Sequence, residues 1–236
     1  MKIMVINPNT SEEMTGHIRE ELERIRRPET ELTVVCPRKG PVAIESSYDE
    51  ILAAFHSLEL VREANEQGYD AVVLACFADP GLVAMKEISD ILVVGIQEAS
   101  FHAAAMLGDK FTILTPMKKR IPSKYNDVWR NKMPYHVASV RELGMTVTET
   151  EQKPELAQQR IMEVSRKAVE EDGAEVIILG CAGMVGYAEA AAKELNVIVI
   201  DPTSVAFKYA EAMAEAGLCH SKRALYAAPS KKEYKK

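Results

Sequence analysis

Two cysteines, Cys76 and Cys181, stand in matching contexts that suit proton-transfer chemistry. Residues 68–76 read GYDAVVLAC and residues 173–181 read GAEVIILGC, at an offset of 105 residues. Buried parallel strands are near-continuous runs of Val, Ile and Leu, so each cysteine is expected at the C-terminal end of such a strand, where open α/β sheets bind ligands. Two thiols facing one site can invert a carbon beside a carbonyl, because one as thiolate removes a proton and the other as thiol returns a proton to the opposite face.

The segments that follow the two cysteines, 77–81 and 182–184, lead into expected helices. Backbone N–H groups at a helix start lower the pKa of a thiol from about 8.5, and they also hold a carboxylate or an enolate. A plainer interpretation stays open, because a buried cysteine is usually a small hydrophobic residue and duplication alone would preserve it twice. A redox pair is a third interpretation, but it lacks close C-x-x-C spacing. Cys36 and Cys219 have no special context and are interpreted as structural.

The rest of the chain repeats the elements that would position these cysteines. Segment 2–8 resembles segment 110–116, so the whole half recurs and not the cysteine strand alone. Helices are predicted to start at Thr10, Ser47 and Asp79, which are polar N-cap residues ahead of apolar residues at helical spacing. The expected strands are 3–6, 32–36, 70–75 and 91–96 in the first half, with 145–148 and 197–200 among those of the second.

Length, composition and charge limit the class of protein. The 236 residues can form one large domain or two smaller ones, and the repeat favours two. A net charge of −6 and a pI near 5.5 argue against a nucleic-acid partner, which needs a basic face. Apolar runs of six to eight residues argue against membrane insertion, which needs roughly 18 to 20. The N-terminus has no leader pattern, so a cytoplasmic location with reduced thiols is expected.

Three motifs in order along the chain resemble one enzyme family. They are INPNT at 6–10, ACFADPG at 75–81 and GCAGM at 180–184, supported by IES at 44–46 and by Gly95-Ile96 before an alanine-rich helix. Together they resemble the hydantoin racemase branch of the aspartate/glutamate racemase superfamily, which includes allantoin racemases. The likeness extends over nearly the whole chain, from the first strand to the helix that ends at Gly217.

The resemblance implies an α/β fold of two Rossmann-like, three-layer halves with parallel sheets, related by pseudo-twofold symmetry and with the active site in the cleft between them. In this family the final helix returns to the first half. The expected division is therefore 1–97 plus 206–236 for the first half and 98–205 for the second. The family works without a cofactor, through two catalytic cysteines that match Cys76 and Cys181. Decarboxylase relatives keep one cysteine of the pair, so the presence of both favours a racemase or epimerase.

The substrate-binding residues expected at the same rim are those beside the strand ends and the cysteines: Asn7, Ser46, Phe77, Ala78, Thr115, Met117, Ala182, Gly183 and Met184. Asn7 also suits a turn before Pro8, and Phe77 and Met184 also suit a plain core. The basic segment 116–120 suits a carboxylate or ureido group, or only a solvated helix face. The five histidines show no metal-ligand spacing, so no metal is expected.

The sequence therefore predicts a cofactor-independent racemase of 5-substituted hydantoins or allantoin that uses a two-base thiol/thiolate mechanism. The expected partner is a small hydantoin-like or ureido molecule, and a homo-oligomer is expected. One alternative is a related enzyme for small acids, such as an aspartate or glutamate racemase or a maleate isomerase, in which a cysteine adds to carbon. The other alternative is a two-lobed binding module without catalysis.

Overall fold

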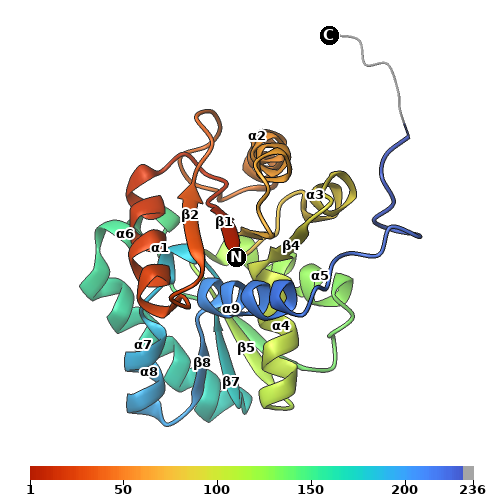
Figure 1. Ribbon diagram of the computed structural model, residues 1–236. Helices are drawn as coiled ribbons and strands as arrows, with labels where there is room; N and C mark the ends of the chain where they lie inside the picture. The colour runs from red at the N-terminus through yellow and green to blue at the C-terminus, as the bar shows by residue number, and fades with distance from the viewer. Residues whose placement is uncertain (231–236) are drawn as a thin grey trace.

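Two wholly parallel four-stranded sheets form the centre of the protein, whose computed structural model describes residues 1–230 (Figure 1). The strand order is β2-β1-β3-β4 in the first sheet and β6-β5-β7-β8 in the second, so the same order occurs twice. The strands are β1 (Lys2–Ile6), β2 (Glu31–Val35), β3 (Ala71–Leu74), β4 (Leu92–Gly95), β5 (Phe111–Thr115), β6 (Val137–Glu142), β7 (Val176–Leu179) and β8 (Ile198–Ile200). The expected α/β fold of two parallel-sheet halves is confirmed.

Helices cover both faces of each sheet because the strands are buried on both sides. In β1, Ile3 and Val5 belong to one buried cluster, whereas Met4 and Ile6 belong to another with Val61. The helices are α1 (Glu12–Ile25), α2 (Ser47–Glu66), α3 (Leu82–Ile88), α4 (Ile96–Leu107), α5 (Ile121–Arg130), α6 (Val147–Gln152), α7 (Pro154–Asp172), α8 (Ala188–Leu195) and α9 (Pro202–Glu215), with short 3-10 turns η1 (Lys118–Arg120) and η2 (Ala182–Met184).

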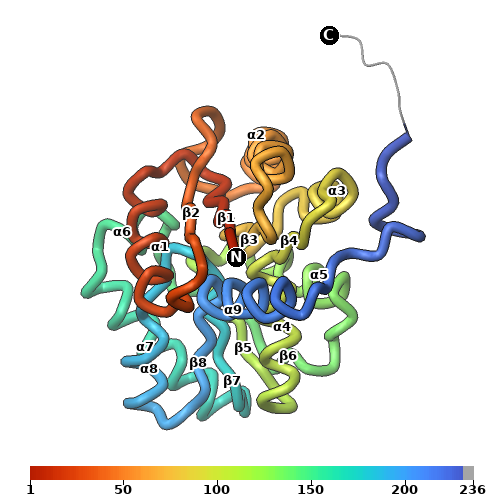
Figure 2. Tube along the Cα trace, viewed as in Figure 1, coloured from red at the N-terminus to blue at the C-terminus, as the bar shows by residue number. Residues whose placement is uncertain are grey.

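Each half sends its last helix to the other half. Helix α4 follows the first sheet along the chain but packs against β7 and β8, whereas α9 follows the second sheet and packs against β1, β3 and β4. The two helices also pack against each other, and Figure 2 traces α9 back to the first sheet. We propose on this basis the discontinuous division 1–97 plus 206–236 and 98–205, whose boundaries fall within α4 and α9. Residues 231–236 of that division lie outside the described residues.

A row of three aromatic rings joins the two halves. Phe77, which follows β3, meets Phe101 of α4 edge-on at 5.8 Å between ring centroids, and Phe101 stacks on Phe111 of β5 at 5.5 Å. All three side chains are buried. Such contacts favour one fixed arrangement of the halves, because aromatic pairs add specific geometry to apolar burial.

Four local predictions were wrong in detail. The second strand of the second half is β6 and not 145–148, where α6 begins. The N-caps of α1 and α2 are Ser11 and Ser46, one residue away from the predicted Thr10 and Ser47. In α1 the Ser11 hydroxyl accepts the Met14 N–H, so the side chain that reaches the free N–H group decides the start.

Asp79 does not start α3. That helix begins at Leu82 after Gly81, which adopts a left-handed backbone conformation. The Asp79 carboxylate instead accepts the N–H groups of Gln97 and Glu98, at the start of α4. The predicted cap therefore exists but serves another helix. Among residues 1–230, none of the helices has the length and apolar content to cross a membrane.

Candidate active site

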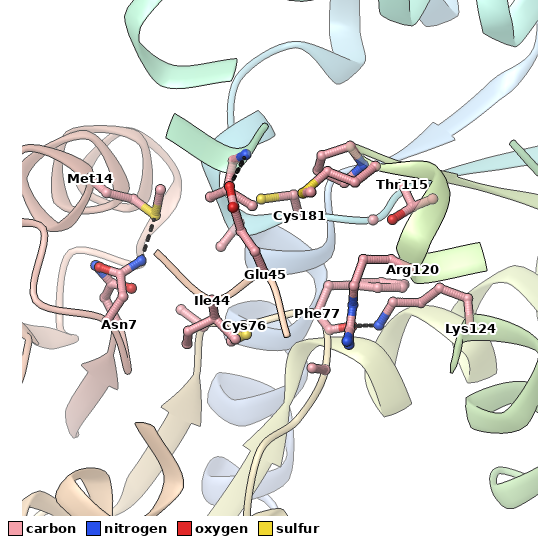
Figure 3. A pocket seen from close by; sticks show the side chains of 18 residues that line it. Asn7, Met14, Ile44, Glu45, Cys76, Phe77, Thr115, Arg120, Lys124 and Cys181 are labelled. Carbon is pink, nitrogen blue, oxygen red and sulfur yellow. Dashed lines mark hydrogen bonds between the residues drawn. The ribbon is translucent and has the colours of Figure 1, made fainter. Parts of the chain in front are cut away.

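A cavity of about 50 Å³ lies where the carboxyl ends of the two sheets meet (Figure 3). Its position follows from the strand pairing. Ile6 pairs with Leu74 and Leu114 pairs with Leu179, so the residues after these strands gather at one rim. The lining residues are Asn7, Asn9, Met14, Ile44, Glu45, Ala75, Cys76, Phe77, Ala78, Thr115, Pro116, Met117, Arg120, Lys124, Val147, Gly180, Cys181 and Ala182.

Cys76 and Cys181 enter this cavity from opposite halves, and Figure 3 shows both at its wall. Both are free thiols. The Gly183 N–H donates to Cys181 Sγ over 3.4 Å. In the other half, the Ala78 N–H lowers the pKa of Cys76 in the same way. Each thiol thus has a backbone donor two residues later in the chain.

The pKa values of the two thiols differ from the sequence-based expectation of a lowered value. Burial raises the pKa of Cys76 to about 12 and the pKa of Cys181 to about 11. The N–H donors and the charge of Lys124 act in the opposite direction, but they are outweighed. The physical reason is that a thiolate loses its hydration in this cavity, and a single backbone donor does not replace it. With these pKa values both groups are thiols at neutral pH.

Asn7 and Thr115 occupy equivalent places, directly after β1 and at the end of β5. The Asn7 amide donates to Asn9 Oδ1 at 2.8 Å and to Thr15 Oγ1 at 3.0 Å. Its own Oδ1 and the Thr115 hydroxyl oxygen are buried and have no hydrogen-bond partner among the described residues. An unpaired buried polar atom is costly, so these two atoms are ready for polar groups of a ligand.

The other expected binding residues divide into two groups. Phe77, Ala78, Met117 and Ala182 line the cavity, as do Asn7 and Thr115. Three do not line it. Ser46 closes a capping box with Asp49 at the start of α2, and Met184 is fully buried in the core. Gly183 faces a neighbouring groove and reaches the site through its N–H alone.

Sequence reasoning did not select Glu45, Arg120 and Lys124 as site residues. Glu45 Oε1 accepts the N–H of Val147 over 2.8 Å, which joins the loop before α2 to α6 in the other half. Arg120 forms an ion pair with Glu50 of α2. Glu45 lies within the motif at 44–46, and Arg120 lies within the basic segment 116–120. Lys124 carried no signal beyond its i,i+3 spacing to Asp127.

The basic segment 116–120 lines the cavity with Pro116, Met117 and Arg120, but it adds no unpaired positive charge there. Lys118 and Lys119 are exposed and do not line it, and Arg120 is already paired. Lys124 is paired as well, with Asp127 at 3.0 Å. Within residues 1–230, no group of three or more His, Cys, Asp or Glu side chains is arranged to hold a metal ion.

Comparison with known proteins identifies close relatives. A family model described as Asp/Glu/Hydantoin racemase matches residues 3–210. A hydantoin racemase of Pseudomonas sp. strain NS671 is 41% identical over 235 residues, which cover 99% of this chain and 94% of the relative.

Two solved structures are similar over the full chain. An allantoin racemase from Klebsiella pneumoniae superposes with a TM-score of 0.96 at 38% identity, covering 100% of this chain and 96% of the other. An allantoin racemase from Pseudomonas fluorescens gives a TM-score of 0.95 at 33% identity, with 100% of both chains covered.

Proposed function

The chain belongs to the Asp/Glu/hydantoin racemase family and is a racemase, and from that premise we propose that it inverts the stereocentre of a 5-substituted hydantoin or of allantoin by passing protons through Cys76 and Cys181. The observation that carries the proposal is the entry of two free thiols into one cavity from opposite halves. A hydrogen-bearing carbon between them would expose one face to each sulfur.

The reaction balances with two protons and no net redox change. One cysteine, as thiolate, removes the proton from the carbon that lies between a carbonyl and a nitrogen, and the bond electrons pass into the enolate. The thiol of the other cysteine then donates its proton to the opposite face of that carbon. The cysteines finish with their protonation states exchanged, and a proton must return before the next turnover in the same direction.

The backbone N–H groups of Ala78 and Gly183 would support a thiolate in both directions of inversion. The Ala78 N–H acts on the sulfur of Cys76, and the Gly183 N–H donates to the sulfur of Cys181. The unpaired Asn7 Oδ1 suits an N–H donor of the substrate ring, and the Thr115 hydroxyl suits either a ring carbonyl or an N–H. Ala78, Phe77, Met117 and Ala182 would shape the walls of the substrate site.

The charges around the cavity favour a neutral cyclic amide over a dicarboxylic amino acid. Both basic side chains of the lining are already paired, Arg120 with Glu50 and Lys124 with Asp127. A substrate carboxylate would need to displace one of these partners, whereas ring N–H and C=O groups can use Asn7 and Thr115 directly.

The test is to incubate one enantiomer at a time in D₂O and to follow optical rotation together with mass. The substrates are 5-substituted hydantoins, allantoin and acidic amino acids. We expect loss of rotation for a hydantoin or allantoin, with one deuterium gained at the stereocentre for each inversion. Loss of rotation without deuterium would reject the proton-transfer scheme, and turnover of acidic amino acids alone would reject the substrate class.

We also propose a homo-oligomer in the cytoplasm. All four cysteines are free, as a reducing compartment would keep them. On α2, Tyr48, Ile51 and Phe55 are exposed apolar residues at helical spacing, and a second copy of the chain is the proposed partner. Light scattering should give a multiple of the 26.1 kDa chain mass, and a monomer at all concentrations would refute this part.

A further inference from the structure

Lys124 is a buried lysine that spans the two halves. It lies on α5, its residue is only 3% exposed, and its ammonium group donates to the backbone carbonyl of Phe77. Phe77 directly follows Cys76 and belongs to the other half. Figure 3 shows the Lys124 side chain reaching toward this carbonyl at the edge of the cavity. Lysine is rarely buried so completely without a specific partner, so its placement calls for a reason.

The groups around Lys124 fix the position of its ammonium group. Asp127 Oδ2 accepts from Lys124 Nζ at 3.0 Å and also from Gln97 Nε2 at 2.9 Å. The other oxygen of Asp127 is paired with Arg130 at 3.4 Å. One carboxylate thus serves two cations and an amide. The Phe77 carbonyl likewise accepts from Gln97 Nε2 as well as from Lys124, which fixes the Phe77–Ala78 peptide.

The two thiols share the charge of Lys124 and no other cation to a comparable extent. It lowers the pKa of Cys76 and the pKa of Cys181, although burial raises both overall. The acidic groups act on separate cysteines, because Glu50 raises the pKa of Cys76, whereas Glu151 and Glu45 raise the pKa of Cys181. A cation that both thiols feel suits a reaction in which negative charge passes from one sulfur through an enolate to the other.

We propose that Lys124 is a positioning residue for both cysteines: it fixes the Phe77–Ala78 peptide through the Phe77 carbonyl, and its charge supports the thiolate on either side of the cavity. This inference rests on the proposed two-thiol function and adds to it the group that serves both directions of inversion. The second half supplies the lysine, while the first half supplies the carbonyl that holds it.

The test measures thiolate reactivity without any substrate. Iodoacetamide alkylation of Cys76 and of Cys181 is followed separately by peptide mass spectrometry between pH 7 and pH 10. In Lys124→Met we expect both rates to fall roughly threefold to fivefold at each pH. A rise of one pKa unit removes about tenfold of the thiolate, and the greater nucleophilicity of a more basic thiolate restores part of the rate. Lys124→Arg, which keeps the charge, should restore most of the rate at both sites.

Two further variants keep the test decisive. Lys118→Met, an exposed lysine just before α5, is the matched control and should leave both rates unchanged. Asp127→Asn removes the countercharge but keeps the shape, so both rates should rise even if Lys124→Met fails to fold. A change confined to Cys76 would show a purely local role through Phe77 and overturn the proposal, and so would unchanged rates at both cysteines in Lys124→Met and Asp127→Asn.

The outcome separates this inference from the proposed function. Slower alkylation at both cysteines, with no inversion of any hydantoin or of allantoin by the unchanged protein, would support the role of Lys124 and sink the substrate proposal. Inversion of a hydantoin, together with alkylation rates that do not change when Lys124 is substituted, would support the substrate proposal and refute the role of Lys124.

Discussion

The loops after Cys76 and after Cys181 are each joined to a crossing helix by one carboxylate. That carboxylate lies on the loop in the first half and at the start of the helix in the second half. In the first half Asp79 lies on the loop itself and accepts the N–H groups of Gln97 and Glu98 at the start of α4. In the second half Asp201 caps α9 through Thr203 and Ser204, and it reaches back to the Gly186 N–H in the region after Cys181. Either way, one acidic side chain ties the cysteine loop to the helix that crosses to the other half.

The two halves thus make an equivalent tie with an acceptor carboxylate at different positions, Asp79 on the cysteine loop and Asp201 at the start of the helix. The two halves have equivalent strands, equivalent crossing helices and equivalent thiol donors at Ala78 and Gly183. Burial acts in the same direction on both thiols and raises the pKa of Cys181 to about 11 and that of Cys76 to about 12. The proposed two-base inversion therefore draws on two thiols in similar surroundings, held by loops that are tied in different ways.

Removing either sulfur should have the largest effect. We expect Cys76→Ser and Cys181→Ser each to lower kcat/KM for racemisation by about 10²–10⁴-fold, because each loses a proton donor or acceptor on one face. In D₂O each variant should still exchange the hydrogen of one enantiomer without inverting it, and the two variants should choose opposite enantiomers. Chiral chromatography with mass detection measures both quantities.

Cys36→Ser is the matched control for these variants, since Cys36 does not line the cavity. Exchange of the same enantiomer by both single-thiol variants would place the two sulfurs on one face of the substrate. That result would end the comparison of the halves as two opposed bases.

Asp79 offers a pH-dependent test of the carboxylate tie. Burial and the charge of Glu98 raise the pKa of Asp79 to about 7, well above the value of about 3.9 in an unfolded chain. Its stabilisation is therefore complete below about pH 4 and is lost as the pH rises through 7. Asp79→Asn lacks this loss, so between pH 5 and pH 8 its free energy of unfolding should gain roughly 2–3 kcal/mol relative to the unaltered protein.

Urea unfolding at the two pH values gives this difference, whatever the constant cost of replacing one carboxylate oxygen by an amide. Asn suits the site because Asp79 has a positive φ of 44°, which Asn tolerates as well as Asp. Asp201→Asn should shift in the same direction, since the pKa of Asp201 is also raised by burial. A gap that stays constant with pH would mean that Asp79 is not protonated in the folded protein.

The residues just before the cysteines differ in how much space they leave. Ala75 precedes Cys76, but Gly180 precedes Cys181, and a Cβ at Gly180 would lie 2.4 Å from the backbone oxygen of Leu114. Gly180→Ala should cost about 1–3 kcal/mol, because a backbone atom must move. Ala75→Gly should cost only about 0.5–1 kcal/mol. Equal losses in urea unfolding would show that the close strand contact is not specific to the second half.

The repeat in the sequence predicted most of the fold and the two cysteines, but not every partner of the site. An offset of 105 residues carries strand 32–36 onto 137–141, which is nearly β6, so consistent use of the repeat would have avoided the error at 145–148. Lys124 was out of reach for a different reason. Its partner is the Phe77 carbonyl in the other half, and a backbone acceptor leaves no pattern in side chains.

Asp79 shows the same limit, since an aspartate before proline predicts a cap without telling which helix is capped. Asp79 caps α4 because the two halves pack so that the start of α4 lies beside the Asp79 loop. The raised pKa values of the two thiols also required the structure, because burial outweighs the N–H donors that the sequence suggests.

The smallest effect on the free energy of unfolding is expected for substitutions on the outer face of α2. There the first half has exposed apolar residues where the second half has polar ones. The buried residues Ala53 and Ala64 of α2 correspond to Ala157 and Ala168 of α7, so both helices pack through a similar face. The outer positions Ile51 and Phe55, 69% and 70% exposed, correspond to the polar Glu155 and Gln159.

Copying the second half onto the first, as Ile51→Glu with Phe55→Gln, should change the free energy of unfolding of the single chain by about 0.5 kcal/mol or less, because both side chains are largely exposed. Urea unfolding at concentrations low enough to keep both proteins monomeric measures it, and light scattering at high concentration should show lost self-association. A loss above about 1 kcal/mol in the monomer would instead assign these side chains a role inside the fold, and the apolar face would no longer distinguish the first half as the one that meets a second copy.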